Sequence, residues 1–552
     1  MRWAQDIKPG ILALAPTLAA IAALAAGLML LASGATPSQP ERLRYLVEFA
    51  PLSLVEISHF LSSILGLVLV LLAFGLRRRL DAAWAATIGL VTLSAILALL
   101  KGFNWEESVA LGLIGILLLS MHEAFPRKAR LTRLEITPGW MLSALAAIAG
   151  TVSLGLWSFH NVGYSDELWW RVMADNDVSR SLRASAGVAI LFMVVGIWRL
   201  LSTPATPPVV GDDDPTFERV RAILASSEGA PPEANLALLG DKRFLFSQSG
   251  ETFLMFGVRG RSWIALGPPV GRREERMELL WRFRELADAH AARPALYGIG
   301  PDILPEAVEL GLSIQKTGES AAVPLESFSL KGRKREVLRR NWRKAGEVGA
   351  LFEVVPAQAV PAILDELETI SDAWLEHHAG GDKAFSMGGF IRRYVAEFPC
   401  ALVRVDGKIV AFATIWTTPD RTTFSMDLMR YSDDAPKNVM DYLFVELLHW
   451  GAGQGYVAFE FGVAPLAGLE DRPLAPIMSR VGRLLFERGE EIYNFRGVRR
   501  YKDKYDPIWE PRYVAAPHKW AIPILLADAS MLASGGMAGL AKRPKRTDEP
   551  TV

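Results

Sequence analysis

Acidic and basic side chains with the spacing of a reaction site occur where a strand-like run ends near residue 430. Asp427 alternates with three apolar residues, so the two-residue period of a strand aims its carboxylate away from their common face. Those apolar residues are Phe424, Met426 and Leu428. Arg430 follows at the end of the run and can line the same opening. Such a pair can accept a proton, hold an ammonium group or neutralise a phosphate, whereas the simpler interpretation is a surface Asp beside a surface Arg.

A second candidate segment, residues 490–513, alternates cations with aromatic rings. Glu490 stands at its start, and Tyr501 and Tyr505 separate several of its basic residues. The cations grouped around these tyrosines are Arg499, Arg500, Lys502 and Lys504. Basic residues interleaved with tyrosines suit a polyanion or a phosphate ester, and the alternative is an ion-paired surface loop.

The most concentrated positive charge lies in Lys331–Lys344, where the only acid is Glu336. Its basic residues are Lys331, Arg333, Lys334, Arg335, Arg339, Arg340, Arg343 and Lys344. Leu338 and Trp342 are one helical turn apart and are expected to seat a helix on the protein, which leaves cations on the other faces. This composition is typical of a helix that binds an RNA backbone, of one that binds an anionic lipid surface, and of a plain solvent-exposed helix, and the three interpretations stay open.

The segments that carry these residues belong to two similar stretches in which short strands precede a helix. The strand-like runs are 244–247, 252–258, 262–266, 401–405, 409–416 and 422–428, and the helical stretches are 274–290 and 437–451. Asp406-Gly407, between two of the runs, is a strong hairpin signal. The pattern predicts two antiparallel sheet-plus-helix units in tandem, an α+β domain.

Composition and motifs exclude several classes of protein. Lysine and arginine number 60 and aspartate and glutamate 60, so the chain is neither a strongly basic nucleic-acid coat nor an acidic tail protein. The single cysteine, Cys400, excludes an intrachain disulfide and a cysteine-rich zinc site. No R-x-x-G-x-[GA] loop for coenzyme A and no G-x-x-x-x-G-K-[ST] loop for a nucleotide occurs. We therefore expect no cofactor and no metal.

The first 201 residues carry the apolar excess that raises the hydrophobic share of the chain to 51%. Six runs are expected to span a membrane, at 11–34, 52–76, 82–100, 108–121, 139–159 and 184–201. Arginine-rich loops after the second and fourth runs place both ends of this region in the cytoplasm. The region is either a membrane anchor or a lipid-handling domain. Glu56 and His59, one turn apart, are an intramembrane functional pair or a buried hydrogen-bonded pair.

These patterns divide the chain into five parts. They are a transmembrane helical domain at 1–201, a Pro-rich acidic linker at 202–215, a first unit with the basic helix at 216–345, a second, catalytic unit at 346–526 and a C-terminal tail at 527–552. The end of the tail is charged and contains proline, so we expect it to be disordered.

Longer blocks of the sequence resemble one known family, the lysylphosphatidylglycerol synthases or multiple peptide resistance factors. The blocks include G-D-K-R-F-L-F-S at Gly240–Ser247, S-W-I-A-L-G at Ser262–Gly267, K-G-R-K-R-E-V-L-R-R-N at Lys331–Asn341, S-M-D-L-M-R-Y at Ser425–Tyr431 and Y-N-F-R-G-V-R-R-Y-K-D-K-Y-D-P-I-W-E-P-R-Y at Tyr493–Tyr513. The resemblance continues into the apolar half with I-S-H-F-L-S-S-I-L-G at Ile57–Gly66. One departure is Glu460, where the family's pattern leads us to expect Asn.

The resemblance implies an α-helical membrane domain of about six transmembrane helices, followed by a cytosolic α+β domain of two tandem GNAT-like folds. It implies transfer of an aminoacyl group, lysyl first and alanyl next, from aminoacyl-tRNA to the hydroxyl of phosphatidylglycerol in the bacterial inner membrane. The product would reduce negative membrane charge and favour resistance to cationic antimicrobial peptides. The alternatives are a tRNA-dependent aminoacyltransferase acting on a peptidoglycan precursor and a non-catalytic lipid-handling membrane protein, and a homo-oligomer is left open.

The resemblance also assigns roles to residues. The family's D-L-M-R motif falls on Asp427 and Arg430, and its Y-K-x-K motif falls on Lys502 and Lys504. The Glu of its H-G-E-like segment falls on Glu490, and these five are the expected catalytic residues. The expected substrate-binding residues are Arg333, Lys334, Arg339, Arg340, Arg499 and Arg500. We expect the aspartate, Arg430 and the two lysines to converge on one cleft between the two units.

Overall fold

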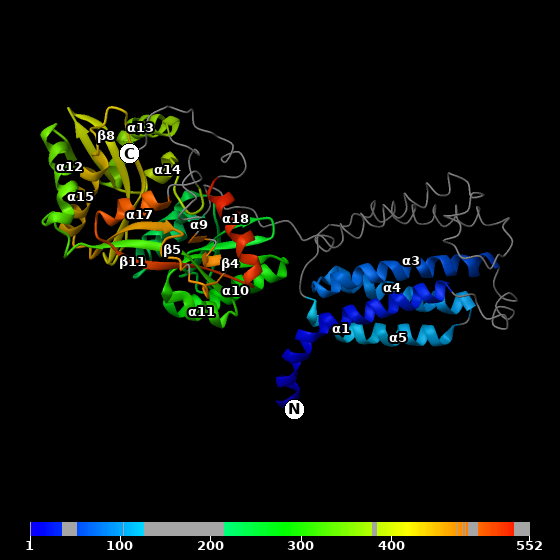
Figure 1. Cartoon of the computed structure of the whole chain (residues 1–552). Helices are drawn as coiled ribbons and strands as arrows, with labels where there is room; N and C mark the ends of the chain where they lie inside the picture. The colour runs from blue at the N-terminus through cyan, green and yellow to red at the C-terminus, as the bar shows by residue number, and fades with distance from the viewer. Residues whose placement is uncertain are drawn as a thin grey trace. The chain divides into compact units, whose positions relative to one another are not determined.

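The computed structural model describes parts of both halves of the chain. It covers residues 2–35, 52–102, 104–125, 215–377, 384–470, 472–476, 478–480, 482–483 and 495–534. Apart from Ala289–Ala291, the chain divides into a unit up to Thr206 and a unit from Pro207 onward (Figure 1). The fifth and sixth apolar runs, the linker up to residue 214 and Glu490 lie outside the described residues.

Long apolar helices form the described part of the first unit and coincide with the first four apolar runs. They are α1 (Arg2–Ala35), α3 (Leu52–Arg77), α4 (Asp81–Gly102) and α5 (Trp105–Ser120), followed by the short η1 (His122–Ala124). Helices α1 and α3 pack closely, because a Cβ atom on Gly27 would lie 2.7 Å from the carbonyl oxygen of Gly66. The stretches Leu14–Ser33 and Asp81–Leu99 are long and apolar enough to cross a membrane. Glu56 and His59 fall on α3, but their side chains lie outside the described residues.

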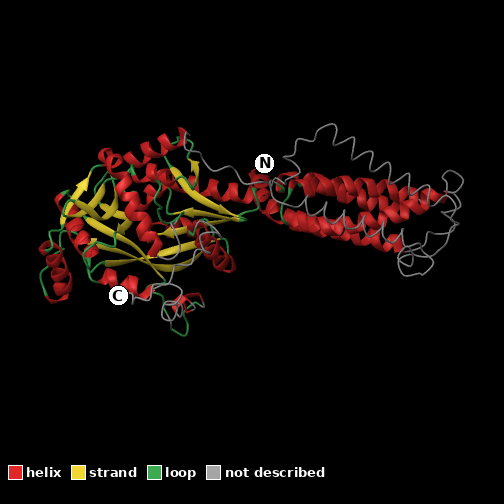
Figure 2. Ribbon diagram, turned by 90° about the horizontal axis from the view of Figure 1, so that it is seen from above, coloured by secondary structure: helices red, strands yellow, loops and turns green. Residues whose placement is uncertain are grey.

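A sheet of eleven strands runs through the second unit, with helices on both of its faces (Figure 2). The strands are β1 (Arg243–Phe246), β2 (Phe253–Arg259), β3 (Ser262–Leu266), β4 (Arg293–Ile299), β5 (Ser313–Pro324), β6 (Leu351–Val355), β7 (Cys400–Val405), β8 (Lys408–Thr417), β9 (Thr423–Tyr431), β10 (Ala458–Pro465) and β11 (Ile508–Ala516). Their order across the sheet is β1-β2-β3-β4-β11-β5-β10-β9-β8-β7-β6.

Helices connect these strands and cover the sheet. They are α9 (Pro215–Ser226), η3 (Pro232–Leu239), η4 (Arg273–Glu275), α10 (Arg276–Ala289), η5 (Pro301–Ile303), α11 (Leu304–Glu309), η6 (Arg333–Arg335), α12 (Glu336–Glu347), η7 (Ala357–Ile363), α13 (Leu364–His377), α14 (Arg392–Val395), α15 (Val439–Gly453), α17 (Phe495–Asp503), η9 (Lys519–Ala521) and α18 (Ile522–Ala533). We call β1–β4 with α9–α11 the first lobe, and β6–β10 with α12–α17 the second lobe.

The two lobes repeat one pattern, as the sequence predicted. In each lobe an antiparallel meander is followed by a helix and then by a strand that pairs in parallel with the last strand of the meander. That helix is α10 between β3 and β4, and α15 between β9 and β10. The Asp406-Gly407 hairpin is confirmed, since both residues adopt the left-handed backbone conformation of such a turn, with φ of 49° and 80°.

The lobes exchange their next strands. β5 follows the first lobe in sequence but pairs with β10 of the second lobe, and β11 follows the second lobe but pairs with β4 of the first. β5 and β11 also pair with each other, over nine residue pairs, at the centre of the sheet. Each lobe therefore completes its sheet with a strand from the other, and the two units predicted as tandem modules form one hydrogen-bonded body.

Alternation along β7 shows which helices cover which face. Ala401 and Val403 pack in one core cluster with α12 and α15, whereas Cys400 and Leu402 pack in another with α13. The cluster that contains α9, η3, α14 and α18 also contains Trp416, which lies on the α13 face of β8. The sheet thus has one face covered by α9, η3, α13 and α18 and one covered by α12 and α15.

Two predicted boundaries are wrong. The sequence pattern assigned the basic helix α12 to the first of the two predicted sheet-plus-helix units, residues 216–345. The helix instead packs on α15 of the second lobe through Leu338 and Ala345. The tail was assigned to begin at residue 527, but α18 continues to Ala533 and buries Leu525 and Ala529 in the core. In both cases apolar residues spaced three, four or seven apart along the helix find a packing surface.

The exchanged strands predict that the lobes unfold together. Replacing the fully buried Phe459 of β10 with Ala should lower the free energy of unfolding by about 3–5 kcal/mol. Native-state hydrogen exchange of the full chain in detergent should show the loss equally in β2 of the other lobe. A matched change at the exposed Leu351 should have little effect, and an unchanged protection of β2 in Phe459→Ala would contradict the coupling.

Candidate active site

A break in strand pairing creates the site. β9 and β10 pair in parallel only from Thr423 to Ser425 and from Ala458 to Glu460, although both strands continue. Just beyond that point the pairing of β9 with β8 shifts by one residue, and the amide of Leu428 donates to the hydroxyl of Thr414 at 3.0 Å. This β-bulge re-aims the side chains that follow it.

The bulge changes one face assignment made from the sequence. Phe424 and Met426 pack in the core with α15, as predicted, and Asp427 points to the opposite face. Leu428 does not share the face of Phe424, because the extra residue of the bulge turns it into the cluster with α13. Arg430 lies on that face too, with its guanidinium 4.0 Å from the ring centroid of Trp374 on α13.

Asp427 is held by two donors in a setting with little solvent. The hydroxyl of Tyr394 donates to Oδ2 at 2.9 Å and the amide of Gly388 donates to Oδ1 at 2.9 Å. Burial raises the pKa of Asp427 to about 6, against the opposing effect of those hydrogen bonds and of the charges of Lys242 and Arg430. A carboxylate with this pKa is ionised at neutral pH and is still basic enough to take a proton.

The first lobe contributes a buried lysine to the same place. Lys242 is 1% exposed, its ammonium contacts Asp241 Oδ1 at 2.6 Å, and it lies 5.9 Å from the ring centroid of Phe385. Asp241 also accepts the amide of Phe385 at 2.5 Å. Burial lowers the pKa of Lys242, and its charge acts on Asp427. The site therefore combines β9 and α14 of one lobe with the loop before β1 of the other.

The predicted convergence of all four charged residues is wrong for Lys504. Its ammonium faces Asp441 on α15 at 3.3 Å, and the hydroxyl of Tyr505 and the amide of Asn341 donate to the same carboxylate. Tyr505 and α15 belong to the core on the far side of the sheet from Asp427. The turn that follows α17 carries this side chain onto α15, so Lys504 is the partly exposed cation of a network centred on the buried Asp441.

Lys502 is also engaged by the backbone. Its ammonium donates to the carbonyls of Gly462 and Val463 at 2.9 and 3.0 Å, where β10 bulges and Gly462 takes a φ of 72°. Burial lowers the pKa of Lys502 to about 8. The lysine therefore secures the part of β10 that no longer pairs with β9, and its ammonium donates to those carbonyls and not to Asp427.

The expected substrate-binding residues separate into two groups. Arg339 donates to the carbonyl of Leu330 at 2.6 Å, and Arg499 pairs with Glu319 at 2.7 Å and stacks over Trp509, so both stabilise the fold. The other residues expose their side chains on the surface of the second lobe; they are Arg333, Lys334, Arg340 and Arg500. Arg335, between them, donates to the carbonyls of Lys504 and Tyr505 and ties η6 to α17.

Sequence reasoning missed Lys242, Tyr394 and the pairing role of Asp441. Lys242 stands in the quoted block at Gly240–Ser247, and a lysine directly before an aromatic strand was the available signal. Tyr394 carried no such signal, because only the tertiary fold brings α14 against β9.

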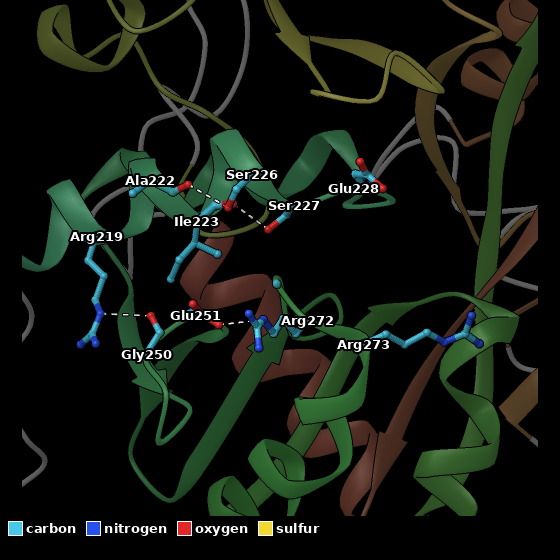
Figure 3. Close-up of a pocket in the computed structure, with 11 residues that line it drawn as sticks. Arg219, Ala222, Ile223, Ser226, Ser227, Glu228, Gly250, Glu251, Arg272 and Arg273 are labelled. Carbon is cyan, nitrogen blue, oxygen red and sulfur yellow. Dashed lines mark hydrogen bonds and ion pairs between the residues drawn. The ribbon is translucent and has the colours of Figure 1, made fainter.

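An open cavity of about 590 Å³ lies elsewhere, in the first lobe (Figure 3). Arg219, Arg272 and Arg273 line it, with Arg219 donating to the carbonyl of Gly250 and Arg272 paired with Glu251. Its lining includes none of the groups around Asp427, so this cavity is not the site described above.

Comparison with known proteins identifies the family. Residues 221–516, more than half of the chain, match the family described as phosphatidylglycerol lysyltransferase, C-terminal. The phosphatidylglycerol lysyltransferase of Bacillus subtilis (strain 168) is 30% identical over 495 residues, which are 89% of this chain and 56% of that protein. The corresponding protein of Staphylococcus aureus (strain COL) is 30% identical over 282 residues, 51% of this chain and 33% of its own length. The chain thus spans about half or less of the curated relatives it matches.

Two solved structures resemble the second unit. The C-terminal domain described for a lysylphosphatidylglycerol synthetase of Agrobacterium fabrum is 42% identical, with a TM-score of 0.53, and the match covers 58% of this chain and 97% of that domain. L-PGS from Bacillus licheniformis is 31% identical, with a TM-score of 0.53, over 59% of this chain and 98% of its own. The second unit resembles the fold of these two proteins. The chain belongs to the phosphatidylglycerol lysyltransferase family.

The reassignment of Lys504 predicts a loss of stability. Lys504→Met removes the cation that faces the buried Asp441, so the free energy of unfolding should fall by about 1–3 kcal/mol. Arg500→Met, an exposed position on α17 four residues earlier, should change it by less than about 0.5 kcal/mol. Urea unfolding of the two variants measures the difference. A Lys504→Met protein that keeps full stability and loses activity would return Lys504 to the catalytic residues.

Proposed function

We propose that this protein transfers an aminoacyl group from aminoacyl-tRNA to the hydroxyl of phosphatidylglycerol, with lysyl as the first candidate and alanyl as the next. Membership of the phosphatidylglycerol lysyltransferase family supports this proposal. The observation that carries it is the partly buried carboxylate of Asp427, with a pKa of about 6, placed between the two lobes beside Lys242 and Arg430.

The chemistry is the exchange of one ester for another. In our proposal the carboxylate of Asp427 takes the proton of the lipid hydroxyl while that oxygen attacks the aminoacyl carbonyl. The bond between the carbonyl and the ribose oxygen of the tRNA then breaks, and the proton passes from Asp427 to that oxygen. Because one ester replaces another, alignment of the two substrates can supply much of the rate enhancement.

The cations beside Asp427 have separate tasks in this scheme. Arg430 is fixed over Trp374 and is 8% exposed, so its guanidinium is suited to hold the lipid phosphate next to the base. Lys242 is fully buried against Asp241 and keeps Asp427 ionised through its charge. Tyr394 orients the carboxylate.

The exposed cations of η6 and α12 are proposed to contact the tRNA. Arg333, Lys334 and Arg340 face solvent, and their helix is anchored by Arg335 and by Asn341, which donates to Asp441 at 2.7 Å. A rigid row of cations suits a phosphate backbone, and the binding it supplies depends strongly on salt.

We further propose that the first unit holds the enzyme in the bacterial inner membrane, with the second unit in the cytosol where tRNA is available. The apolar stretches Leu14–Ser33 and Asp81–Leu99 support an association with membrane. Lysyl-phosphatidylglycerol carries a positive headgroup, so its synthesis would lower the negative charge of the membrane and favour resistance to cationic peptides.

Asp427→Asn keeps the shape of the side chain and removes its basicity. Transfer of a labelled aminoacyl group from tRNA to phosphatidylglycerol should fall by about 10²–10⁴-fold, with stability retained. In the unmodified chain, kcat/KM should rise with pH through an apparent pKa of about 6, because the base must lose its proton to act, and Asp427→Asn should lack this limb.

Lipid extracts of cells that express the chain test the function itself. A new aminoacyl-phosphatidylglycerol, identified by mass, would support the proposal and name the amino acid. An altered peptidoglycan bridge without a new lipid would assign the transfer to another acceptor. If neither the lipids nor the bridge changed, the result would favour a non-catalytic lipid-handling protein. Full activity in Asp427→Asn would remove Asp427 from the catalytic residues.

Charge reversal tests the tRNA surface. Arg333→Glu with Arg340→Glu should weaken tRNA binding about ten-fold or more at low salt and flatten its dependence on salt concentration, since fewer phosphate contacts release fewer counterions. Lys408→Glu, on the exposed turn of the β7–β8 hairpin, is the control. Unchanged tRNA binding together with weaker binding to anionic vesicles would move this surface to the lipid side.

A further inference from the structure

A second group of polar side chains lies on the same face of the sheet as Asp427, at the last residue pair before β9 and β10 separate. Glu460 of β10 pairs with Ser425 of β9, and the hydroxyl of Ser425 donates to the Glu460 carbonyl at 2.7 Å. Phe459 and Phe461 pack on the α15 side, so the carboxylate of Glu460 faces the other way, toward η3 of the first lobe.

The carboxylate of Glu460 is buried and incompletely satisfied. Its residue is 8% exposed, and Oε1 lies 3.7 Å from a guanidinium nitrogen of Arg512 on β11. No hydrogen-bond donor in the described chain reaches Oε2. A buried carboxylate oxygen without a donor costs free energy, and proteins keep such groups where a ligand satisfies them.

Further carboxylates surround Glu460. Glu233 on η3 and Glu510 on β11 act on it electrostatically, against the single guanidinium of Arg512. Burial and the neighbouring Glu233 raise the pKa of Glu460, while Arg512 opposes the rise. The described groups that face Glu460 thus carry an excess of negative charge, and a cation placed among them would relieve it.

A buried serine hydroxyl without a hydrogen-bond partner in the part of the protein that the structure describes lies on the same face of the sheet as Glu460. Ser320 of β5 is 2% exposed, and its hydroxyl oxygen has no partner in the described chain. Ser320 pairs with Glu510 and lies two residues from Ala322, which pairs with Glu460, so the three side chains share one face. The carboxylates and this hydroxyl offer acceptors for the three hydrogens of an ammonium group. Among the described residues they do not form a group that could hold a metal ion.

The distance from Asp427 defines which ammonium fits. Glu460 pairs with Ser425, two residues before Asp427, so the Cα atoms of Glu460 and Asp427 are roughly 8 Å apart. The α-ammonium of an aminoacyl ester lies next to the reacting carbonyl, whereas the end of an extended lysyl side chain lies roughly 7 Å from it. A carbonyl beside Asp427 therefore brings the side-chain terminus, and not the α-ammonium, to Glu460.

We propose that Glu460, with Glu233 and Ser320, binds the primary ammonium at the end of the side chain of the transferred aminoacyl group. This inference rests on the proposed function, and it selects a lysyl-type donor over an alanyl one. Recognition depends on the first lobe, because Glu233 lies on η3, and on both exchanged strands, which carry Ser320 and Arg512.

Small esters test the site without the transfer reaction. The probes are L-lysine methyl ester and L-norleucine methyl ester, which has an apolar side chain of similar length, titrated into the full chain in detergent by ligand-observed NMR. The chain should prefer the lysine ester by about ten-fold or more, the worth of a charged hydrogen bond. Glu460→Gln keeps the shape and should abolish the preference, Glu233→Gln should reduce it, and the surface variant Glu353→Gln should leave it unchanged.

The same titration at several pH values adds a second readout. The carboxyl of Glu460 must be ionised to bind an ammonium group. Because burial and Glu233 raise its pKa to about 8, the ionised fraction grows as the pH rises from 6 to roughly 8, and the preference for the lysine ester should strengthen over that range. The norleucine ester and Glu460→Gln should not show this change. Thermal unfolding of Glu460→Gln checks that the variant is folded.

The outcomes separate this inference from the proposed function. No preference for the lysine ester, or an equal preference in Glu460→Gln, overturns the inference even if the chain makes aminoacyl-phosphatidylglycerol. A Glu460→Gln protein that loses alanine methyl ester as well as lysine methyl ester also overturns it, since that result assigns the α-ammonium. A Glu460-dependent preference in a chain that transfers nothing to phosphatidylglycerol leaves the inference standing and removes the proposed function.

Discussion

The antiparallel pairing of β5 with β11 is the constraint on which the rest of the second unit depends. Each of these strands leaves its own lobe and completes the sheet of the other, so neither lobe has a full set of backbone hydrogen bonds alone. A sheet edge left unpaired would expose a row of amides and carbonyls. The exchange removes that exposure and fixes the two lobes in one register.

That register brings the site together from both lobes. Asp427 and Tyr394 come from the second lobe and Lys242 from the first, and the acidic group at Glu460 takes Glu233 from the first lobe as well. The local cause is the short parallel pairing of β9 with β10, which leaves side chains beyond it without a neighbouring strand. Buried charges are costly, and the carboxylate of Asp427 is stabilised by hydrogen bonds from the hydroxyl of Tyr394 and the amide of Gly388.

Sequence patterns predicted the elements better than their partners. Alternation placed Asp427 away from the apolar face, and Asp406-Gly407 marked a hairpin that the structure confirms. The bulge that displaces Leu428 depends on the hydroxyl of Thr414 from another strand, and the network that engages Lys504 depends on Asp441 from a helix over sixty residues earlier. Each of these contacts joins segments that are distant in the sequence, and the local period of one segment carries no information on the other.

The exchange also has a consequence for how the protein is made. β4 ends at Ile299 and its partner β11 begins at Ile508, so the ribosome must add about two hundred residues before the first lobe can close. At ~5–20 residues per second this takes roughly 10–40 s, during which β4 is an open edge. Chains interrupted before β11 hold Asp427 and Lys242 but lack the strand that completes the first lobe. Newly made protein is therefore expected to need protection by chaperones and to become competent only when synthesis has passed β11.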